Sequence, residues 1–314
     1  MDALIIGAGG FVGSYLIQEL NQKNLHVGAT LLPREHIRSG ICDTFTLDIM
    51  QENEIKNLLR THRPKYIYHL AAQSSVAASW KNPELTIDIN IKGSLHLLEA
   101  VRSIPEYYPR ILLVGSGEEY GWLKSQAPVT EFTPLHPGNP YAATKAFQNM
   151  LGTIYAKSYG MGIVMVRAFN HIGIGQAPVF VAADFALQIA EIEAGFRPPV
   201  MQVGNLTAKR DFSDVRDVVR AYSLLMEKGC AGETYNVGSG HAVAIQELLD
   251  ILLDFSTKSI VIEQNPDRMR PSDVPVIEAD ISKLQTDTGW KPIYSLEETL
   301  YSMLAHHRKN FGLA

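Results

Sequence analysis

A tyrosine and a lysine stand four residues apart, at Tyr141 and Lys145. Because residues four apart share one face of a helix, their Cβ atoms would lie about 5–6 Å from each other. A phenol has an ordinary pKa of about 10, too high for easy proton transfer near neutrality, and a fixed ammonium group nearby would lower that pKa. The pair therefore predicts an acid that gives a proton to an oxygen atom. Such pairs also occur by chance on helix surfaces, so the chemistry depends on what else lies close by.

A hydroxyl group is predicted to complete this chemistry. Ser116 follows an apolar stretch at residues 111–114 that is typical of a buried strand. Ligands bind at the carboxyl ends of strands in parallel sheets, so Ser116 is placed to steady a carbonyl oxygen during its reduction. Asn90 lies inside a predicted helix, and we interpret it either as the anchor of a proton-relay water or as an ordinary polar helix residue. Together, Ser116, Tyr141 and Lys145 predict a catalyst of carbonyl–alcohol interconversion.

A glycine-rich segment near the start of the chain predicts a dinucleotide site. Residues 7–13 read GAGGFVG, directly after the apolar residues 4–6 and at the start of a predicted helix over 11–23. Glycines here allow a tight turn, a close approach of the backbone to a pyrophosphate and close packing of helix on strand, while the helix start offers free N–H groups to the anion. A purely structural loop is the alternative, and the strand–turn–helix context argues against it.

The end of the second predicted strand bears on the choice of cofactor. Residues 29–34 read ATLLPR and contain no acid to accept the adenosine ribose hydroxyls, whereas Arg34 and Arg38 could hold a 2′-phosphate. The sequence therefore favours NADP(H), with NAD(H) as the alternative if the arginines point to water. The residues expected to bind the cofactor come from this strand, the glycine loop, later strand ends and the catalytic helix: Gly7, Gly10, Phe11, Val12, Gly13, Thr30, Arg34, Asp48, Ile49, Leu70, Ala71, Ala72, Tyr141 and Lys145.

Apolar strands alternate with helices through the first half of the chain. This rhythm predicts a doubly wound parallel sheet, covered by helices on both faces. Strands are expected at residues 4–6, 26–30, 66–70, 110–114 and 162–167, and helices at 11–23, 53–62, 85–103 and 141–159. After residue 175, prolines interrupt the pattern and shorter helices are expected at 214–228, 245–255 and 296–309. We therefore expect an α/β fold, with a dinucleotide-binding domain at 1–175 and a smaller α+β substrate-binding region at 176–314, some of whose segments return to the sheet.

Composition excludes several classes of function. The 314 residues are 46% hydrophobic and carry a net charge of −5 without a basic stripe, which argues against a nucleic-acid partner. No apolar run approaches the roughly 20 residues of a membrane helix. The two cysteines, Cys42 and Cys230, and the ten histidines show no metal-ligand spacing, so we expect no metal. A reduced, cytoplasmic enzyme is the plain expectation.

Five motifs resemble those of extended short-chain dehydrogenases/reductases that act on nucleotide sugars. They are the glycine loop and the segments HLAAQ (69–73), SGEEYG (116–121), YAATK (141–145) and RAFNH (167–171). Within that group the chain is similar to the branch of the GDP-mannose 4,6-dehydratases and GDP-4-keto-6-deoxy-D-mannose reductases. This similarity rests on the motifs VGNL (203–206), RDFSD (210–214) and RPSDVP (270–275). The resemblance runs nearly from end to end and implies a Rossmann fold with a nicotinamide cofactor.

The resemblance also implies where a GDP-sugar would bind. Asn170 would lie on its diphosphate side, Arg210 and Arg270 would pair with its phosphates, and residues 180–181 would lie near the guanine. Arginine forks suit phosphate oxygens, although these two could instead form structural ion pairs with Asp214, Asp217 or Asp273. The complete set expected to bind substrate is Ser75, Ser116, Glu118, Asn170, Val181, Asn205, Arg210 and Arg270.

The branch contains two reactions, and the motifs favour one of them. A dehydratase needs a base for the C5 proton, and the resemblance gives that role to Glu118, which the reductases also retain. The glycine loop, the short stretch at 31–40 and the RPSDVP segment are more similar to the reductases. We therefore expect reduction of the C4 keto group of GDP-4-keto-6-deoxy-D-mannose to GDP-D-rhamnose, that is, GDP-6-deoxy-D-mannose. The alternatives are the dehydratase, a reductase that gives the C4 epimer GDP-6-deoxy-D-talose and, more distantly, a non-catalytic dinucleotide-binding protein. The resemblance also implies a homodimer, for which the helices at 85–103 and 141–159 are the candidates, with burial of their apolar faces inside the subunit as the alternative.

Overall fold

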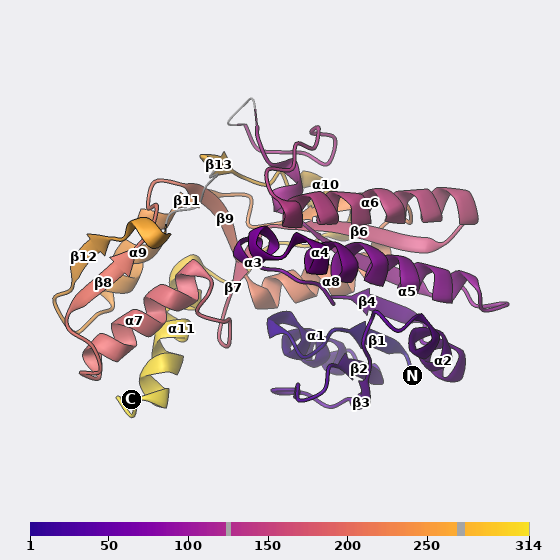
Figure 1. Cartoon of the computed structure of the whole chain (residues 1–314), viewed down its shortest axis with the longest axis horizontal. Helices are drawn as coiled ribbons and strands as arrows, with labels where there is room; N and C mark the ends of the chain where they lie inside the picture. The colour runs from indigo at the N-terminus through magenta and orange to yellow at the C-terminus, as the bar shows by residue number, and fades with distance from the viewer. Residues whose placement is uncertain (124–126, 269–273, 314) are drawn as a thin grey trace.

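Seven parallel strands form the central sheet of the part of the chain described by the computed structural model, residues 1–123, 127–268 and 274–313. Their order is β10-β6-β5-β4-β1-β2-β3 (Figure 1). Most of these strands are buried, as expected for a sheet covered on both faces. The predicted doubly wound α/β fold is therefore confirmed. The strand bounds are Ala3–Ile6 (β1), Val27–Leu31 (β2), Asp43–Thr46 (β3), Tyr66–His69 (β4), Arg110–Ser116 (β5), Gly162–Ala168 (β6) and Thr234–Val237 (β10).

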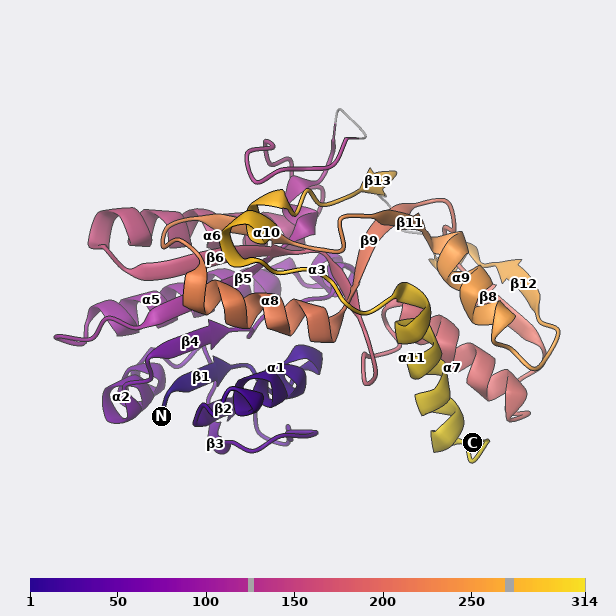
Figure 2. The same ribbon diagram turned by 180° about the vertical axis from the view of Figure 1, so that it is seen from behind.

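Helices cover both faces of this sheet. On one face α1 (Phe11–Gln22) and α8 (Val215–Lys228) pack side by side, and α10 (Ser282–Thr288) adds Leu284 to the same apolar core (Figure 2). The other face is covered by α2 (Glu52–His62), α5 (Gly93–Arg102) and α6 (Pro140–Tyr159), whose buried side chains form a second apolar core. The sheet is thus the middle layer of three.

The helix predicted over residues 85–103 is interrupted. After α3 (Val76–Lys81), the chain forms α4 (Pro83–Ile87), then a π-helical turn at Asp88–Lys92, and only then α5. A π turn places an extra residue in the helix and often marks a functional site. Here it includes Asn90, which is fully buried.

A second lobe follows the sheet in the second half of the chain. It contains α7 (Val181–Glu193), α9 (Ile245–Asp254) and α11 (Leu296–Asn310), with a parallel pair of strands, β8 (Val200–Val203) and β12 (Val261–Gln264). These elements share a third apolar core (Figure 1). A four-stranded sheet joins this lobe to the large sheet: β9 (Lys209–Asp214) pairs with β7 (Asn170–Ile172), β11 (Ala242–Ala244) and β13 (Val276–Ile277).

The second half of the chain also contributes to the large sheet. Strand β10 pairs with β6, and α8 and α10 pack on the face that α1 covers. The predicted division at residue 175 stays a prediction. Segments beyond it contribute to the core between the large sheet and α1 as well as to the core of the second lobe. Strand order reverses beside β1, whose neighbours are β2 and β4, and parallel sheets bind ligands beyond such a switch point. In the described part of the chain, no helix is long and apolar enough to cross a lipid bilayer.

Candidate active site

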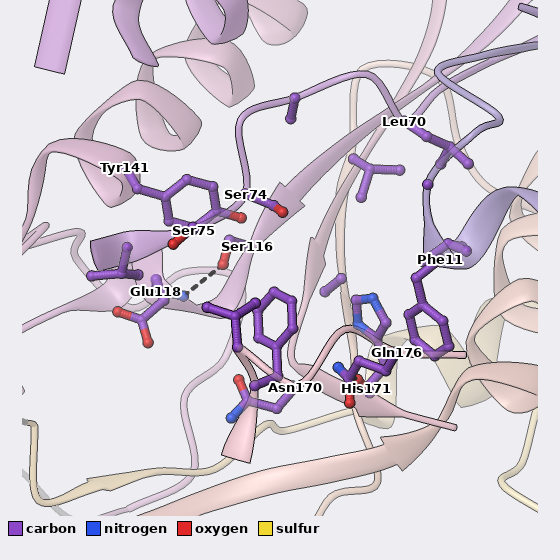
Figure 3. Close-up of a pocket in the computed structure, with 18 of the residues that line it drawn as sticks. Phe11, Leu70, Ser74, Ser75, Ser116, Glu118, Tyr141, Asn170, His171 and Gln176 are labelled. Carbon is purple, nitrogen blue, oxygen red and sulfur yellow. Dashed lines mark hydrogen bonds between the residues drawn. The ribbon is translucent and has the colours of Figure 1, made fainter. Parts of the chain in front are cut away.

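A cavity of about 770 Å³ opens beyond the carboxyl ends of the central strands. The glycine loop lines one part of it, and residues of α7 and of the segment after β8 line another. The expected cofactor and substrate residues meet here with two exceptions. Arg34 lies outside the lining, and Arg270 lies outside the described residues. Figure 3 shows ten of the lining residues by name.

The geometry of the glycine loop admits no side chain at two of its positions. Gly7 has φ +84°, and a Cβ there would lie 2.5 Å from Cα of Ala71. At Gly13 a Cβ would lie 2.0 Å from the carbonyl oxygen of Ala8, so glycine is what lets α1 pack this closely on its own loop. Gly10 is the N-cap of α1 and offers no side chain to the first turn. The free N–H groups of that turn are therefore available to an anion in the cavity.

Side chains around the loop fix it and extend the lining. The hydroxyl of Thr30 accepts a hydrogen bond from the backbone N–H of Gly7 across 3.0 Å, which ties the loop to β2. Asp48 accepts from the backbone N–H of Met50 across 2.9 Å, which holds its carboxylate in the loop after β3. The other lining residues expected to bind cofactor are Phe11, Val12, Ile49, Leu70, Ala71 and Ala72.

An acid that the sequence analysis missed lies at the end of β2. The carboxylate of Glu35 accepts from the backbone N–H of Leu32 across 2.7 Å and lines the cavity. It packs against the glycine loop, because a Cβ on Gly9 would come within 2.4 Å of its Oε2. Arg34 has a left-handed backbone at φ +73°, and this turn brings the following residue back to the loop. Arg38 instead donates to the backbone carbonyl of Gly175. The segment after β2 thus presents an acid to the cavity, whereas Arg34 and Arg38 lie outside its lining.

A buried ion pair holds Ser116 in place. Its hydroxyl accepts from the backbone N–H of Glu118 across 3.2 Å, and its own N–H donates to the Glu119 carboxylate across 2.8 Å. Glu119 in turn accepts from Nε of Arg167 across 3.0 Å, and both side chains are buried. Arg167 lies in a motif to which the sequence analysis gave no separate role. The short 3₁₀ helix at Gly117–Tyr120 is thereby anchored to β6.

Tyr141 lies in the first turn of α6, beside Ser116. Asn139 caps this helix by accepting from the N–H of Ala142 across 2.8 Å, and Pro140 stands at the first helical position. Burial raises the pKa of the Tyr141 phenol above its ordinary value, while the Ser116 hydroxyl acts in the opposite direction. Figure 3 shows the Tyr141 ring next to Ser116, Glu118 and Ser75.

The expectation that Lys145 lowers that pKa stays a prediction, because the ammonium group bonds the end of β5 in this structure. Its ammonium group donates to the carbonyl oxygen of Val114 across 2.7 Å and to the Gln148 carboxamide across 3.0 Å. Burial lowers the pKa of Lys145 itself to about 8, with Glu119 opposing the shift. Helical spacing puts the two Cβ atoms on one face, but the long lysine chain ends at the strand rather than at the phenol.

Asn90 joins three elements behind the catalytic residues. Its amide group donates to the Thr144 hydroxyl across 2.9 Å and to the Gln73 carbonyl across 3.1 Å, and its oxygen accepts from the Gln73 N–H across 2.8 Å. Its backbone carbonyl accepts from the Ser94 hydroxyl across 2.7 Å. These contacts connect the π turn with α6 and with the loop after β4. They favour a positioning role over that of an ordinary helix residue.

Glu118 lies beside the catalytic hydroxyls. Its Oε2 accepts from the Asn139 amide across 3.1 Å, which places the carboxylate at the start of α6. Ser75 caps α3 by accepting from the N–H of Ala78 across 3.2 Å and lines the same end of the cavity. This end therefore brings the hydroxyl groups of Ser75, Ser116 and Tyr141 close to the Glu118 carboxylate.

The residues expected at the diphosphate and guanine lie along the far wall. Asn170 and Val181 both line the cavity, and the rings of Phe11 and His171 stack with centroids 6.1 Å apart. Burial lowers the pKa of His171. Gln176 donates to the His171 backbone carbonyl across 2.9 Å.

Arg210 is buried and lines the cavity, where it donates to the backbone carbonyl of Val274 across 2.6 Å. Of the acids expected as alternative partners, Asp214 pairs with Arg216 and Asp217 with Arg220. Asp273 and Arg270 lie outside the described residues. Asn205 lines the cavity as expected, and its side-chain oxygen accepts from the Thr207 N–H across 3.0 Å.

An ion pair of the lining escaped the sequence analysis. Asp184 of α7 and Arg268 form an ion pair 2.5 Å long, although they lie 84 positions apart in the sequence. No local pattern signals such a pair. Within the described ranges, no group of three His, Cys, Asp or Glu side chains is arranged to hold a metal ion.

Comparison with known proteins identifies the family. The family model described as GDP-mannose 4,6 dehydratase matches residues 4–303. A GDP-6-deoxy-D-mannose reductase of Pseudomonas aeruginosa is 33% identical over 96% of this chain and 95% of its own length. The chain belongs to the GDP-mannose 4,6-dehydratase family. A GDP-mannose 4,6-dehydratase of Yersinia enterocolitica is 28% identical over 96% of this chain and 92% of its own length.

Solved structures agree with this family assignment. The structure of RMD from Pseudomonas aeruginosa complexed with NADPH superposes with a TM-score of 0.85 at 32% identity, and the match covers 99% of this chain and 100% of that one. A Thermus thermophilus UDP-glucose 4-epimerase complexed with NAD gives a TM-score of 0.87 at 28% identity, with 98% and 99% covered. The predicted family of nucleotide-sugar enzymes is confirmed.

Proposed function

We propose that the protein reduces the C4 keto group of GDP-4-keto-6-deoxy-D-mannose with NAD(P)H and produces GDP-6-deoxy-D-mannose, also called GDP-D-rhamnose. The observation that carries this proposal is the meeting of Ser116, Tyr141 and Lys145 with the glycine loop around one cavity. The 33% identity to a GDP-6-deoxy-D-mannose reductase supports the choice of substrate.

The residues around the glycine loop fit a dinucleotide. A Cβ atom at Gly7 or Gly13 would clash with the backbone of Ala71 or Ala8, so glycine keeps the loop compact. The N-terminus of α1 faces the same cavity. When bound, the cofactor supplies the hydride. Lys145, which bonds the carbonyl of Val114 near the end of β5, would hold the nicotinamide ribose. We propose NADP(H) as the cofactor, with NAD(H) as the alternative that Glu35 supports.

The catalytic residues provide the proton. Because burial keeps the pKa of Tyr141 high, its phenol is protonated at neutral pH, which is the form that reduction requires. As C4 gains a hydride, its carbonyl oxygen becomes an alkoxide and takes the phenolic proton. The Ser116 hydroxyl, which accepts from the Glu118 N–H, would donate to the same oxygen as its negative charge develops, while Glu119 holds the Ser116 backbone.

A dehydratase is the second candidate, and the position of Glu118 is what favours it. Its carboxylate, held by Asn139, lies beside Ser116 and could accept a C5 proton. The two functions are separated by their requirement for reductant. The purified protein is incubated with GDP-mannose alone, and separately with the keto sugar and NADPH or NADH.

The reductase consumes NAD(P)H only with the keto sugar. Formation of a 4-keto-6-deoxy product from GDP-mannose without reductant would instead identify a dehydratase. NMR of the reduced product distinguishes GDP-6-deoxy-D-mannose from its C4 epimer, GDP-6-deoxy-D-talose. A non-catalytic dinucleotide-binding protein would turn over neither substrate.

We further propose a homodimer in which α6 packs against a second copy. Phe147, Met150 and Ile154 follow one another at helical spacing on α6 and are 41%, 53% and 55% exposed. On the neighbouring α4, Leu85 and Ile87 are also exposed. A contiguous apolar stripe of this kind suits a helix–helix interface.

A further inference from the structure

Asp184 contributes a carboxylate to the cavity lining, away from the catalytic end. Asp184 lies in the first turn of α7, three residues after Val181, and its side chain is 17% exposed. Its Oδ2 accepts from Nη1 of Arg268 across 2.5 Å and from Nε2 of Gln188 across 2.7 Å. Both bonds converge on one oxygen, so Oδ1 retains its capacity to accept from a ligand.

The orientation of this carboxylate is fixed from behind. Gln188 lies one helical turn further along α7 and is 1% exposed. Its carboxamide accepts from the Gln202 N–H across 3.1 Å and donates to the Gln202 carbonyl across 3.2 Å, which locks it to β8. A side chain held on both sides in this way loses little conformational entropy when a ligand binds.

We propose that Asp184 recognises the guanine base of the substrate, with Oδ1 accepting from the N1–H and the 2-amino group. This inference rests on the proposed function, because it assumes that a guanine nucleotide enters the cavity. Phe180 and Val181 line the same region and offer an apolar surface to the base. Arg268 balances the charge of the carboxylate, which lowers the cost of covering it with a base.

The chemistry of the bases gives this site its selectivity. Guanine presents two adjacent donors on the edge that carries N1 and the 2-amino group, and both suit a carboxylate. Uracil presents one N–H between two carbonyl oxygens, which a carboxylate would repel. Adenine presents an acceptor at N1. A site that combines an attractive contact for one base with a repulsive contact for the others discriminates on both grounds.

Calorimetric titration of the NADP⁺-loaded protein with GDP, IDP and UDP tests the inference. IDP lacks only the 2-amino group, so the wild type should bind GDP about 10-fold more tightly than IDP and more tightly still than UDP. Asp184→Asn should weaken GDP binding about 10-fold or more and leave UDP binding unchanged. Asp250→Asn is the control, because Asp250 is an exposed carboxylate of the same lobe outside the cavity lining, and it should leave all three affinities unchanged.

Two results would overturn the inference. Equal affinity of the wild type for GDP and IDP would do so even if the Asp184 variant failed to fold. Equal loss of GDP and UDP affinity in Asp184→Asn would show that the residue only supports the lobe. Neither result bears on turnover of the keto sugar, so the reductase proposal stands or falls by its own assay.

Discussion

The ammonium group of Lys145 donates to the backbone carbonyl of Val114 across 2.7 Å. This bond joins the catalytic helix α6 to the end of β5, two residues before Ser116. The charged form of Lys145 is buried here at a cost, since the pKa falls from an ordinary 10.5 to about 8. The carbonyl and Gln148 offset only part of the hydration that the ammonium group loses.

The lowered pKa of Lys145 predicts a pH-dependent stability. Between pH 8 and 10.5 the unfolded chain holds a proton on Lys145 that the folded chain releases. The folded state therefore carries no cost for a buried ammonium group above pH 10.5. This cost grows as the pH falls and is complete once the pH has passed below 8. Replacing Lys145 by Met should stabilise the protein by about 3 kcal/mol more at pH 7 than at pH 10.5.

Urea unfolding of the wild type and the variant at several pH values measures this difference. Lys157→Met, on the exposed surface of the same helix, should show no such trend. Parallel stability curves for the wild type and Lys145→Met would contradict the prediction.

Loss of the Tyr141 hydroxyl should abolish turnover and spare cofactor binding. In Tyr141→Phe the ring still fills its buried site, but no phenol remains to protonate the alkoxide. We expect kcat to fall about 10²- to 10⁴-fold. Tyr155→Phe is a matched control on the same helix, since Tyr155 bonds Glu99 away from the cavity. Its kcat should be unchanged. Steady-state kinetics and fluorescence titration with NADPH provide both measurements, and full activity of Tyr141→Phe would remove this residue from the mechanism.

The sheet and the catalytic set were predictable because both follow from local patterns. Buried parallel strands are apolar throughout, and their carboxyl ends meet at one edge, so the order of Ser116, Tyr141 and Lys145 was enough to bring them together. The direction of the Lys145 side chain was not predictable. Helical periodicity places Cβ atoms, whereas the ammonium group lies four bonds further out and follows its hydrogen-bond partners.

Features that depend on contacts between residues far apart in the chain could not be predicted from the sequence either. The π turn around Asn90 is satisfied by Gln73 and Thr144, neither of which belongs to that helix. Asp184 and Arg268 meet only because α7 and the segment after β12 face the same cavity. Glu35 was overlooked because its approach to the glycine loop depends on a left-handed residue at Arg34.

Glu35 should restrain the use of NADP(H). Its carboxylate lines the cavity beside Gly9, where it can accept ribose hydroxyls and would repel a 2′-phosphate. Glu35→Gln should therefore raise the ratio of kcat/KM for NADPH to that for NADH about 10-fold. Arg34→Ala tests the opposite effect. It should lower the NADPH-to-NADH ratio if Arg34 contacts the 2′-phosphate. An unchanged ratio in Glu35→Gln would place the adenosine ribose elsewhere.

Glu118 should matter far less to a reductase than to a dehydratase. Reduction needs one proton from Tyr141 and no base at C5, so Glu118→Gln should retain kcat within about 10-fold. The neighbouring Glu119→Gln provides the contrast. Its carboxamide keeps one acceptor oxygen, so it cannot accept from both the Ser116 N–H and Arg167, and Arg167 loses its buried counter-charge. Breaking such a pair costs about 3–5 kcal/mol. The measurement is reduction of the keto sugar, with thermal unfolding of both variants. Collapse of reduction in Glu118→Gln would give this carboxylate a role in proton transfer.

The apolar stripe on α6 predicts how the protein associates. A glutamate at Met150 would place a charge in the centre of the proposed interface, where it would be buried without a partner, so Met150→Glu should be monomeric. Ile293→Glu introduces the same charge at another exposed apolar residue and should leave the dimer intact. Sedimentation velocity at several protein concentrations compares the two variants with the wild type. If Met150→Glu sediments like the wild type, the interface lies on another surface. The catalytic residues of α6 face the opposite side of the same helix, so retained activity in a monomeric variant would show that each subunit carries a complete site.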